Sequence, residues 1–169
     1  MKIFITGAKG SGKSTLVQTI LQEQQLQVSG FLTLPLYENG NRIGFYFHSL
    51  IPVQQNDQRF SIQETTSNRT IAGIFDHLGV ECLTNSQGNA YIVMDEIGYL
   101  EHDENSYLSS LTQTIDKNPN IIGVLRKCDI QYICQIRQRK DILLIDLDTI
   151  SFMDAKAMIN KQIEEERKK

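Results

Sequence analysis

Apolar and polar residues follow two different patterns along the chain. Short, mostly apolar runs are typical of strands buried on both faces, and they predict strands over 2–6, 90–95, 121–125 and 142–147. Between them, apolar residues recur every three or four positions, which predicts helices over 13–25, 71–78, about 108–115, 130–139 and from 151 onward. Strands that alternate with helices require crossover connections. The pattern therefore predicts an α/β fold, with a mainly parallel sheet flanked by helices on both faces.

The segment after the first helix has a different pattern. Two aromatic-rich runs flank Asn39-Gly40, and these two residues tolerate the positive φ of a tight hairpin turn; the runs cover 29–37 and 43–50. We therefore expect an antiparallel β-hairpin inserted into the α/β domain. Pro35 cannot donate a ladder hydrogen bond, so its strand should lie at an edge or carry a bulge there. The polar stretch 52–70 resembles a strand only over 59–64.

Composition and charge narrow the function classes. The 169 residues are 40% hydrophobic and 22% charged, which predicts a single folded domain over 1–169. A formal net charge of −3 offers no basic excess, which argues against a nucleic-acid partner. The chain shows neither a bilayer-length apolar run nor a signal peptide, so we expect no membrane association and a cytoplasmic location. Without metal-site spacing, we expect the cysteines to be free thiols: Cys82, Cys128 and Cys134.

The most informative motif is GAKGSGKST, directly behind the first predicted strand. It matches the phosphate-binding loop pattern GxxxxGK[ST] at every defined position. Its glycines let backbone N–H groups approach phosphate oxygens, and the following helix directs its positive end at the same anion. In such loops the lysine reaches the β- and γ-phosphates, and the serine hydroxyl binds Mg²⁺. We assign nucleotide binding to Gly7, Ala8, Lys9, Gly10, Ser11, Gly12, Lys13, Ser14 and Thr15, a catalytic role to Lys13, and a metal ligand to Ser14.

An acidic pair ends the strand predicted over 90–95. In P-loop proteins an acid at this place holds Mg²⁺, usually through water, so Asp95 is the second expected metal ligand. Side chains alternate along a strand, so Glu96 should face a different side, where a carboxylate can orient a water for in-line attack. We therefore predict catalytic roles for both residues. The alternative is that the pair simply begins a polar loop.

Three further residues each have two interpretations. Phosphoryl transfer develops negative charge, and Arg126 follows the strand over 121–125 at the sheet edge where ligands collect. Arg126 is a candidate charge stabiliser, or a surface cation with no catalytic role. Phe45 either stacks on a nucleobase or pairs with aromatic residues on a neighbouring strand. Glu101 either supports the site or is a charge at a helix N-terminus.

Several of these motifs together resemble the small P-loop nucleoside-triphosphatase family that includes the cancer-related nucleoside-triphosphatase. The similarity covers most of residues 1 to about 150 and rests on the phosphate loop, Gly30-Phe-Leu-Thr33 with Gly44-Phe45, and Asp95-Glu-Ile-Gly98 followed by Glu101. The resemblance implies Mg²⁺ as cofactor, a nucleoside triphosphate as substrate, and hydrolytic roles for Lys13, Ser14, Asp95 and Glu96. The chain departs from the family pattern at 34–36, 52–70 and 124–127.

Three functions follow. The leading prediction is Mg²⁺-dependent hydrolysis of nucleoside triphosphates (ATP, GTP and others) to the diphosphate and phosphate. The second is a small nucleoside, nucleotide or metabolite kinase with an acceptor site in residues 30–70, although that region lacks an arginine-rich lid. The third is a nucleotide-binding accessory protein with slow hydrolysis, which would engage a protein partner.

Overall fold

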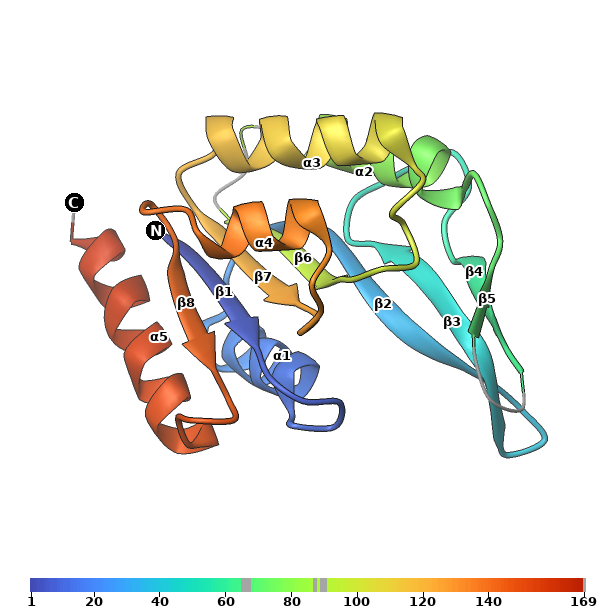
Figure 1. The fold of residues 1–169 in the computed structure, drawn as a ribbon. Coiled ribbons are helices and arrows are strands. Elements are labelled where there is room, and N and C mark those ends of the chain that lie inside the picture. Colours follow the sequence, from blue (N-terminus) through green and yellow to red (C-terminus); the bar gives the residue numbers. More distant parts are fainter. Residues whose placement is uncertain (65–67, 87, 89–90, 169) are drawn as a thin grey trace.

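The computed structural model describes residues 1–64, 68–86, 88 and 91–168. Within these residues, the strands form one sheet in the order β5-β4-β3-β2-β6-β7-β1-β8 (Figure 1). The strands are β1 (Lys2–Thr6), β2 (Val28–Glu38), β3 (Asn41–Ser49), β4 (Gln58–Gln63), β5 (Asn68–Thr70), β6 (Tyr91–Ile97), β7 (Ile121–Leu125) and β8 (Leu143–Asp146). The helices are α1 (Lys13–Gln24), the π-helical η1 (Phe75–Gly79), α2 (Val80–Asn85), α3 (Asn105–Lys117), α4 (Gln131–Arg137) and α5 (Phe152–Arg167).

The sheet has a parallel part and an antiparallel part. Strands β2, β6, β7, β1 and β8 run parallel, while β3, β4 and β5 extend the sheet antiparallel beyond β2. The predicted α/β fold is confirmed, and so is the hairpin, whose turn residues Asn39 and Gly40 have φ of 49° and 79°. The hairpin is not a separate insertion, because β2 pairs with β6 over Val28–Phe31 and with β3 from Phe31 onward. Pro35 lies in the part of β2 that pairs with β3, beside a register shift at Leu36/Tyr37.

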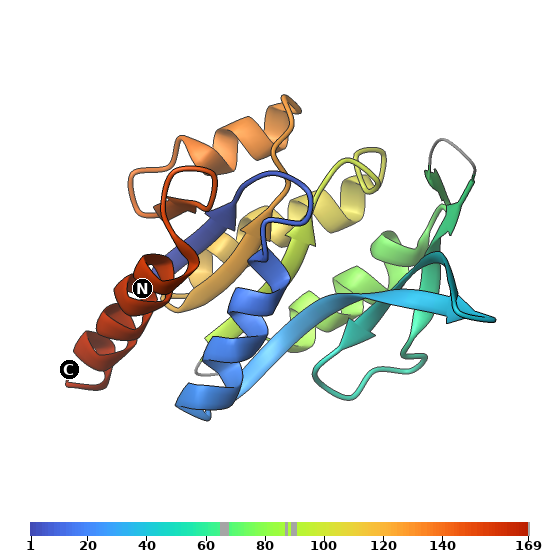
Figure 2. The same ribbon diagram turned by 90° about the horizontal axis from the view of Figure 1, so that it is seen from below.

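Helices cover both faces of the sheet, as predicted. On one face, α1 and α5 lie side by side and bury apolar residues against β1 and β7 (Figure 2). On the other face, η1, α2 and α3 cover a cluster rich in aromatic side chains, in which the Phe31 and Phe47 rings stack at 4.6 Å between centroids. Cys82, Cys128 and Cys134 are free. No helix among the described residues is both long and apolar enough to span a membrane.

Two predicted boundaries are wrong. The helix expected over 71–78 begins at Phe75 and continues as α2 to Asn85, because Gly73 adopts a φ of +86° that a helix cannot include. The strand expected over 90–95 runs to Ile97, because a bulge carries the chain through the acidic pair. Residue 90 lies outside the described residues.

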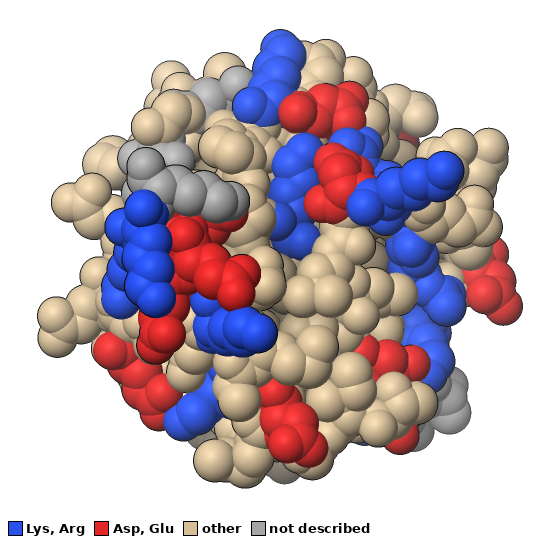
Figure 3. Space-filling view, turned by 90° about the vertical axis from the view of Figure 1, so that its left-hand side faces the viewer, with Lys and Arg blue, Asp and Glu red and all other residues tan. Residues whose placement is uncertain are grey.

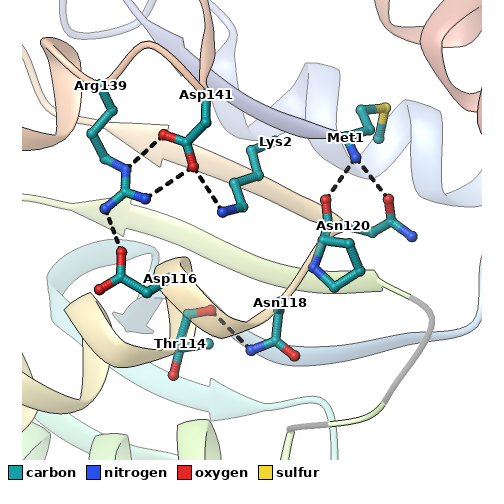
Figure 4. A network of polar contacts seen from close by, with 9 residues as sticks. Met1, Lys2, Thr114, Asp116, Asn118, Asn120, Arg139 and Asp141 are labelled. Atoms are coloured by element: carbon teal, nitrogen blue, oxygen red, sulfur yellow. Dashed lines mark hydrogen bonds and ion pairs between the residues drawn. The ribbon is translucent and has the colours of Figure 1, made fainter.

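Polar contacts fix the amino end of β1 (Figure 4). The Met1 amine donates to the Pro119 carbonyl at 2.6 Å and to Asn120 Oδ1 at 2.9 Å, both ahead of β7. Lys2 Nζ contacts Asp141 Oδ2 at 2.8 Å, ahead of β8. These contacts hold β1 between its two neighbours, and the opposite end of β1 carries the glycine-rich loop.

Charged side chains of both signs are mixed on the molecular face drawn in Figure 3. Oppositely charged side chains also form short ion pairs, such as Lys156–Glu23 at 2.7 Å between α5 and α1. Exposed pairs of this kind contribute about 1 kcal/mol or less to stability. The fold therefore depends mainly on its two apolar layers.

Candidate active site

A cleft of about 460 Å³ lies at the carboxyl end of β1. Pockets for small molecules commonly fall between about 300 and 1,000 Å³, so this one has room for a nucleotide. Its walls are the glycine-rich loop, part of β3, the carboxyl ends of β6 and β7, and the two residues that follow β7. Every predicted loop residue from Gly7 to Thr15 borders the cleft except Ser11, whose N–H donates to the Ala8 carbonyl at 3.2 Å.

The loop conformation explains its glycines. Gly10 and Gly12 have φ of 82° and 91°, in the left-handed region that other residues adopt only at a cost. Helix α1 begins directly afterwards at Lys13. Its first backbone N–H groups and its positive dipole end therefore lie beside the cleft, an arrangement suited to an anion.

The Lys13 ammonium lies against the carbonyls of its own loop. Nζ is 2.7 Å from the Ala8 oxygen and 3.0 Å from the Gly7 oxygen. Burial lowers the pKa of Lys13, and the nearby carboxylates of Glu96 and Asp148 oppose this shift. A phosphate in the cleft would offer this ammonium a stronger, charged partner than the two carbonyls.

Ser14 and Asp95 come together as the sequence predicts. Ser14 Oγ donates to Asp95 Oδ1 at 2.9 Å, across 81 positions of sequence. The Asp95 side chain is buried, and Oδ2 has no hydrogen-bond partner among the described residues. Burial raises the pKa of Asp95 to about 7, against the effect of the Ser14 hydroxyl and the Thr33 backbone. An orphaned carboxylate oxygen beside a hydroxyl matches the ligand chemistry of a hard divalent cation.

This pair does not form a complete metal cage. No cluster of three or more His, Cys, Asp or Glu side chains suited to a metal occurs in the described part of the chain. A cation held by Ser14 and Asp95 would therefore take its other ligands from water and phosphate oxygens, which is how Mg²⁺ binds in nucleotide sites.

Glu96 occupies a strained backbone position. Its φ is +65°, and the β6–β7 register shifts between Met94 and Ile97, so the residue forms a β-bulge. The bulge turns its side chain away from Asp95, toward Arg126, whose Nη1 lies 3.3 Å from Glu96 Oε1. A left-handed glutamate at a bulge is characteristic of a site where the chain re-aims a functional side chain.

Arg126 lies inside the cleft wall rather than free on the surface. Besides its contact with Glu96, its guanidinium covers the Tyr99 ring at 4.4 Å from the centroid. Its neighbour Lys127 pairs with Asp146 at 2.9 Å and Asp148 at 2.8 Å. Both residues border the cleft, but Lys127 is paired with carboxylates at and after the end of β8, whereas Arg126 is paired with Glu96.

Two residues of the site, Asp148 and Arg42, have no role predicted from the sequence, whereas Phe45 has two. Asp148, after β8, accepts from the Ala8 N–H at 2.8 Å and so holds the glycine-rich loop. Arg42 and Phe45 of β3 border the cleft, with the Arg42 guanidinium 5.0 Å from the Phe45 ring centroid. Phe45 also stacks beside Phe60 of β4, as in the cross-strand interpretation. The sequence singles out Gly44-Phe45 as a motif. The structure shows that β3 borders the same cleft as the loop, although β2, β6 and β7 lie between β3 and β1 in the sheet.

Glu101 supports the turn that follows β6. The Gly98 N–H donates to Glu101 Oε1 at 2.5 Å, and the Tyr132 hydroxyl donates to the Gly98 carbonyl, so both sides of Gly98 are held. Only 2% of Glu101 is exposed, and burial raises its pKa to about 7. Glu96 raises this pKa further and Arg126 lowers it.

We expect Glu101→Gln to flatten the pH dependence of stability. The folded-state pKa of about 7 lies above the usual 4.5, so the native protein keeps a proton that the unfolded chain loses. Stability therefore falls as pH rises from 4.5 to about 7, by up to about 3 kcal/mol from this group. Urea denaturation of both proteins between pH 4.5 and 8 measures the difference, and identical slopes would contradict the prediction.

The fold and the cleft together define the class of protein. A glycine-rich loop joins a buried parallel strand to a helix at the carboxyl edge of the sheet, and a hydroxyl–carboxylate pair lies beside it. This is the arrangement of a P-loop nucleoside triphosphate-binding protein. Residues 2–155 match the family model described as "NTPase", so the chain belongs to this NTPase family.

Named relatives agree with this assignment. The "Nucleoside-triphosphatase THEP1" of Thermotoga sp. (strain RQ2) is 25% identical over 155 residues, covering 88% of this chain and 87% of the relative. The "Cancer-related nucleoside-triphosphatase homolog" of Mus musculus is 26% identical over 166 residues, covering 86% and 87%. The predicted family resemblance is thus confirmed, and the chain is a divergent member.

Solved structures show the same fold. The crystal structure of THEP1 from Aquifex aeolicus superposes with a TM-score of 0.70 at 26% identity, covering 87% of this chain and 90% of that one. The solution structure of a human cancer-related nucleoside triphosphatase gives a TM-score of 0.74 at 22% identity, covering 97% of each chain. The second comparison supports the fold alone.

Proposed function

We propose that this protein is a Mg²⁺-dependent phosphohydrolase that converts nucleoside triphosphates, ATP and GTP among them, to the diphosphate and phosphate. The observation that carries the proposal is that the side chains of two adjacent acids, Asp95 and Glu96, point to different parts of the site. Asp95 meets Ser14 of the phosphate loop, while the bulge turns Glu96 toward the other wall of the same cleft. This arrangement supports a cation-binding role for Asp95 and a role for Glu96 in orienting a water.

In this proposal, residues of the protein bind and orient the triphosphate before it is hydrolysed. Backbone N–H groups of the loop and of the first turn of α1 bind the phosphates, and Lys13 exchanges its loop carbonyls for phosphate oxygens. Ser14 and Asp95 hold Mg²⁺, the latter through water; when bound, the cation neutralises charge on the phosphate oxygens. These residues therefore fix the triphosphate with its terminal phosphorus toward Glu96 and Arg126.

Hydrolysis then requires a water in line with the bond that breaks. The Glu96 carboxylate accepts a hydrogen bond from that water and orients its lone pair, and Arg126 meets the charge that develops on the transferring phosphoryl group. The ion pair between Glu96 and Arg126 holds both side chains at the cleft.

The smaller of the two spaces that border Glu96 suits a water molecule. A second cavity of about 20 Å³ adjoins this residue and is walled largely by Phe45, Phe60, Phe75 and Leu100. A cavity of this size holds about one water, which is the acceptor that hydrolysis needs.

The test is phosphate release from a panel of nucleoside triphosphates without any added acceptor. We expect release with Mg²⁺, loss with a chelator, and recovery when Mg²⁺ is restored; the panel also ranks the bases. Tight nucleotide binding without release, or release only with an added acceptor, would overturn the proposal.

A further inference from the structure

Thr33, on β2, carries a hydroxyl without a hydrogen bond. The residue is 7% exposed, and none of the groups that the structure describes pairs with Oγ1. Buried hydroxyls are nearly always paired, and a valine would fill the same volume without this cost. We therefore expect Thr33 Oγ1 to form a hydrogen bond with a molecule other than the protein, such as water.

The surroundings of Thr33 suit one water. Thr33 borders the cavity of about 20 Å³, together with Glu96 and Arg126. Its volume matches a single water, and a buried water needs two to four polar partners, which these three side chains can supply. The rings of Phe45 and Phe75 line the same cavity, so a water there has apolar neighbours besides these three polar side chains.

This cavity adjoins the phosphate cleft. Phe45, Glu96 and Arg126 border both spaces, so a water beside Thr33 lies on the same side of the site as the proposed catalytic pair. Thr33 is also joined to the metal-binding side of the site, because its backbone lies against the Asp95 carboxyl. Thr33 pairs with Phe47 of β3, two residues beyond Phe31, where the pairing of β2 with β6 ends.

We propose that Thr33 is a further catalytic residue, whose hydroxyl binds the attacking water together with Glu96. This inference rests on the proposed hydrolysis. The water donates one hydrogen bond to the Glu96 carboxylate and one to Thr33 Oγ1, which leaves a lone pair directed at phosphorus. As the new P–O bond forms, the bond to the diphosphate breaks and the diphosphate keeps its electron pair. The proton of the water passes to Glu96.

Thr33→Val, Thr33→Ser and a matched control test this role. We expect Thr33→Val to lower kcat by about 10-fold or more, with KM and nucleotide Kd within about 2-fold of wild type. Its Tm should equal or exceed the wild-type value, because the change removes an unpaired buried hydroxyl. Thr33→Ser keeps the hydroxyl and should retain kcat within about 3-fold.

Ser61→Ala is the control, since Ser61 on β4 is fully buried, has an Oγ with no partner in the described residues, and borders neither cavity. It should leave kcat unchanged. If Thr33→Val turns over at the wild-type rate, the role of Thr33 is overturned but the proposed hydrolysis stands. The same holds if both Thr33 variants lose kcat and have a lower Tm. No phosphate release by the wild type would instead overturn the proposed hydrolysis, and the role of Thr33 with it.

Discussion

Phosphate release falls by about 100-fold or more when Glu96 is replaced by glutamine, while nucleotide affinity stays within a few-fold of wild type. Glutamine keeps the shape and one acceptor oxygen but cannot take a proton, and general-base groups contribute about 10² to 10⁴ in rate. The side chain contacts Arg126 rather than the loop, so its loss should leave phosphate binding intact. Steady-state phosphate release and equilibrium nucleotide binding, measured on the same preparations, separate the two effects.

Glu23→Gln is the matched control for this experiment. It also removes one carboxylate and one ion pair, that with Lys156 at 2.7 Å, but on the helical face formed by α1 and α5. Its turnover should equal that of wild type. Unchanged turnover in Glu96→Gln would remove Glu96 from the mechanism, and an equal loss in both variants would attribute the effect to net charge.

The local parts of the site can be predicted from the sequence because they depend on neighbouring residues. The glycine-rich loop needs a strand before it and a helix after it, and both are evident from the apolar pattern. The separation of Asp95 and Glu96 onto two sides also follows from strand alternation. In the structure the Asp95 side chain accepts a hydrogen bond from Ser14, and Glu96 forms an ion pair with Arg126.

The remaining parts depend on pairing between distant strands, which one sequence does not reveal. Alternation alone did not predict the left-handed φ of Glu96, because the bulge arises from its register against β7. Likewise Arg42 and Phe45 reach the cleft only because β3 extends the main sheet, whereas an isolated hairpin could lie anywhere. Asp148 contacts Ala8 across 140 positions of sequence.

Lys13→Ala should weaken nucleotide binding by at least about 100-fold. The ammonium is already directed into the loop, 2.7 Å from the Ala8 carbonyl, so moving to phosphate oxygens requires little rearrangement. Each hydrogen bond to a charged group contributes about 1.5–3 kcal/mol, and two of them account for about 100-fold in Kd. Titration calorimetry with Mg²⁺ and a nucleoside triphosphate measures the change directly.

Lys9→Ala provides a control that isolates position from charge. Lys9 belongs to the same loop, which binds phosphate through backbone N–H groups that the alanine variant keeps. Its side chain carries the same charge as that of Lys13, but it is exposed and has no described contact with the loop carbonyls that Lys13 approaches. Its loss should change Kd by about 3-fold or less, because an exposed charge acts on the phosphates through water and salt. If the two alanine variants bind equally well, the ammonium of Lys13 stays on its loop carbonyls when nucleotide binds. Phosphate affinity would then come from the backbone N–H groups and the α1 dipole alone.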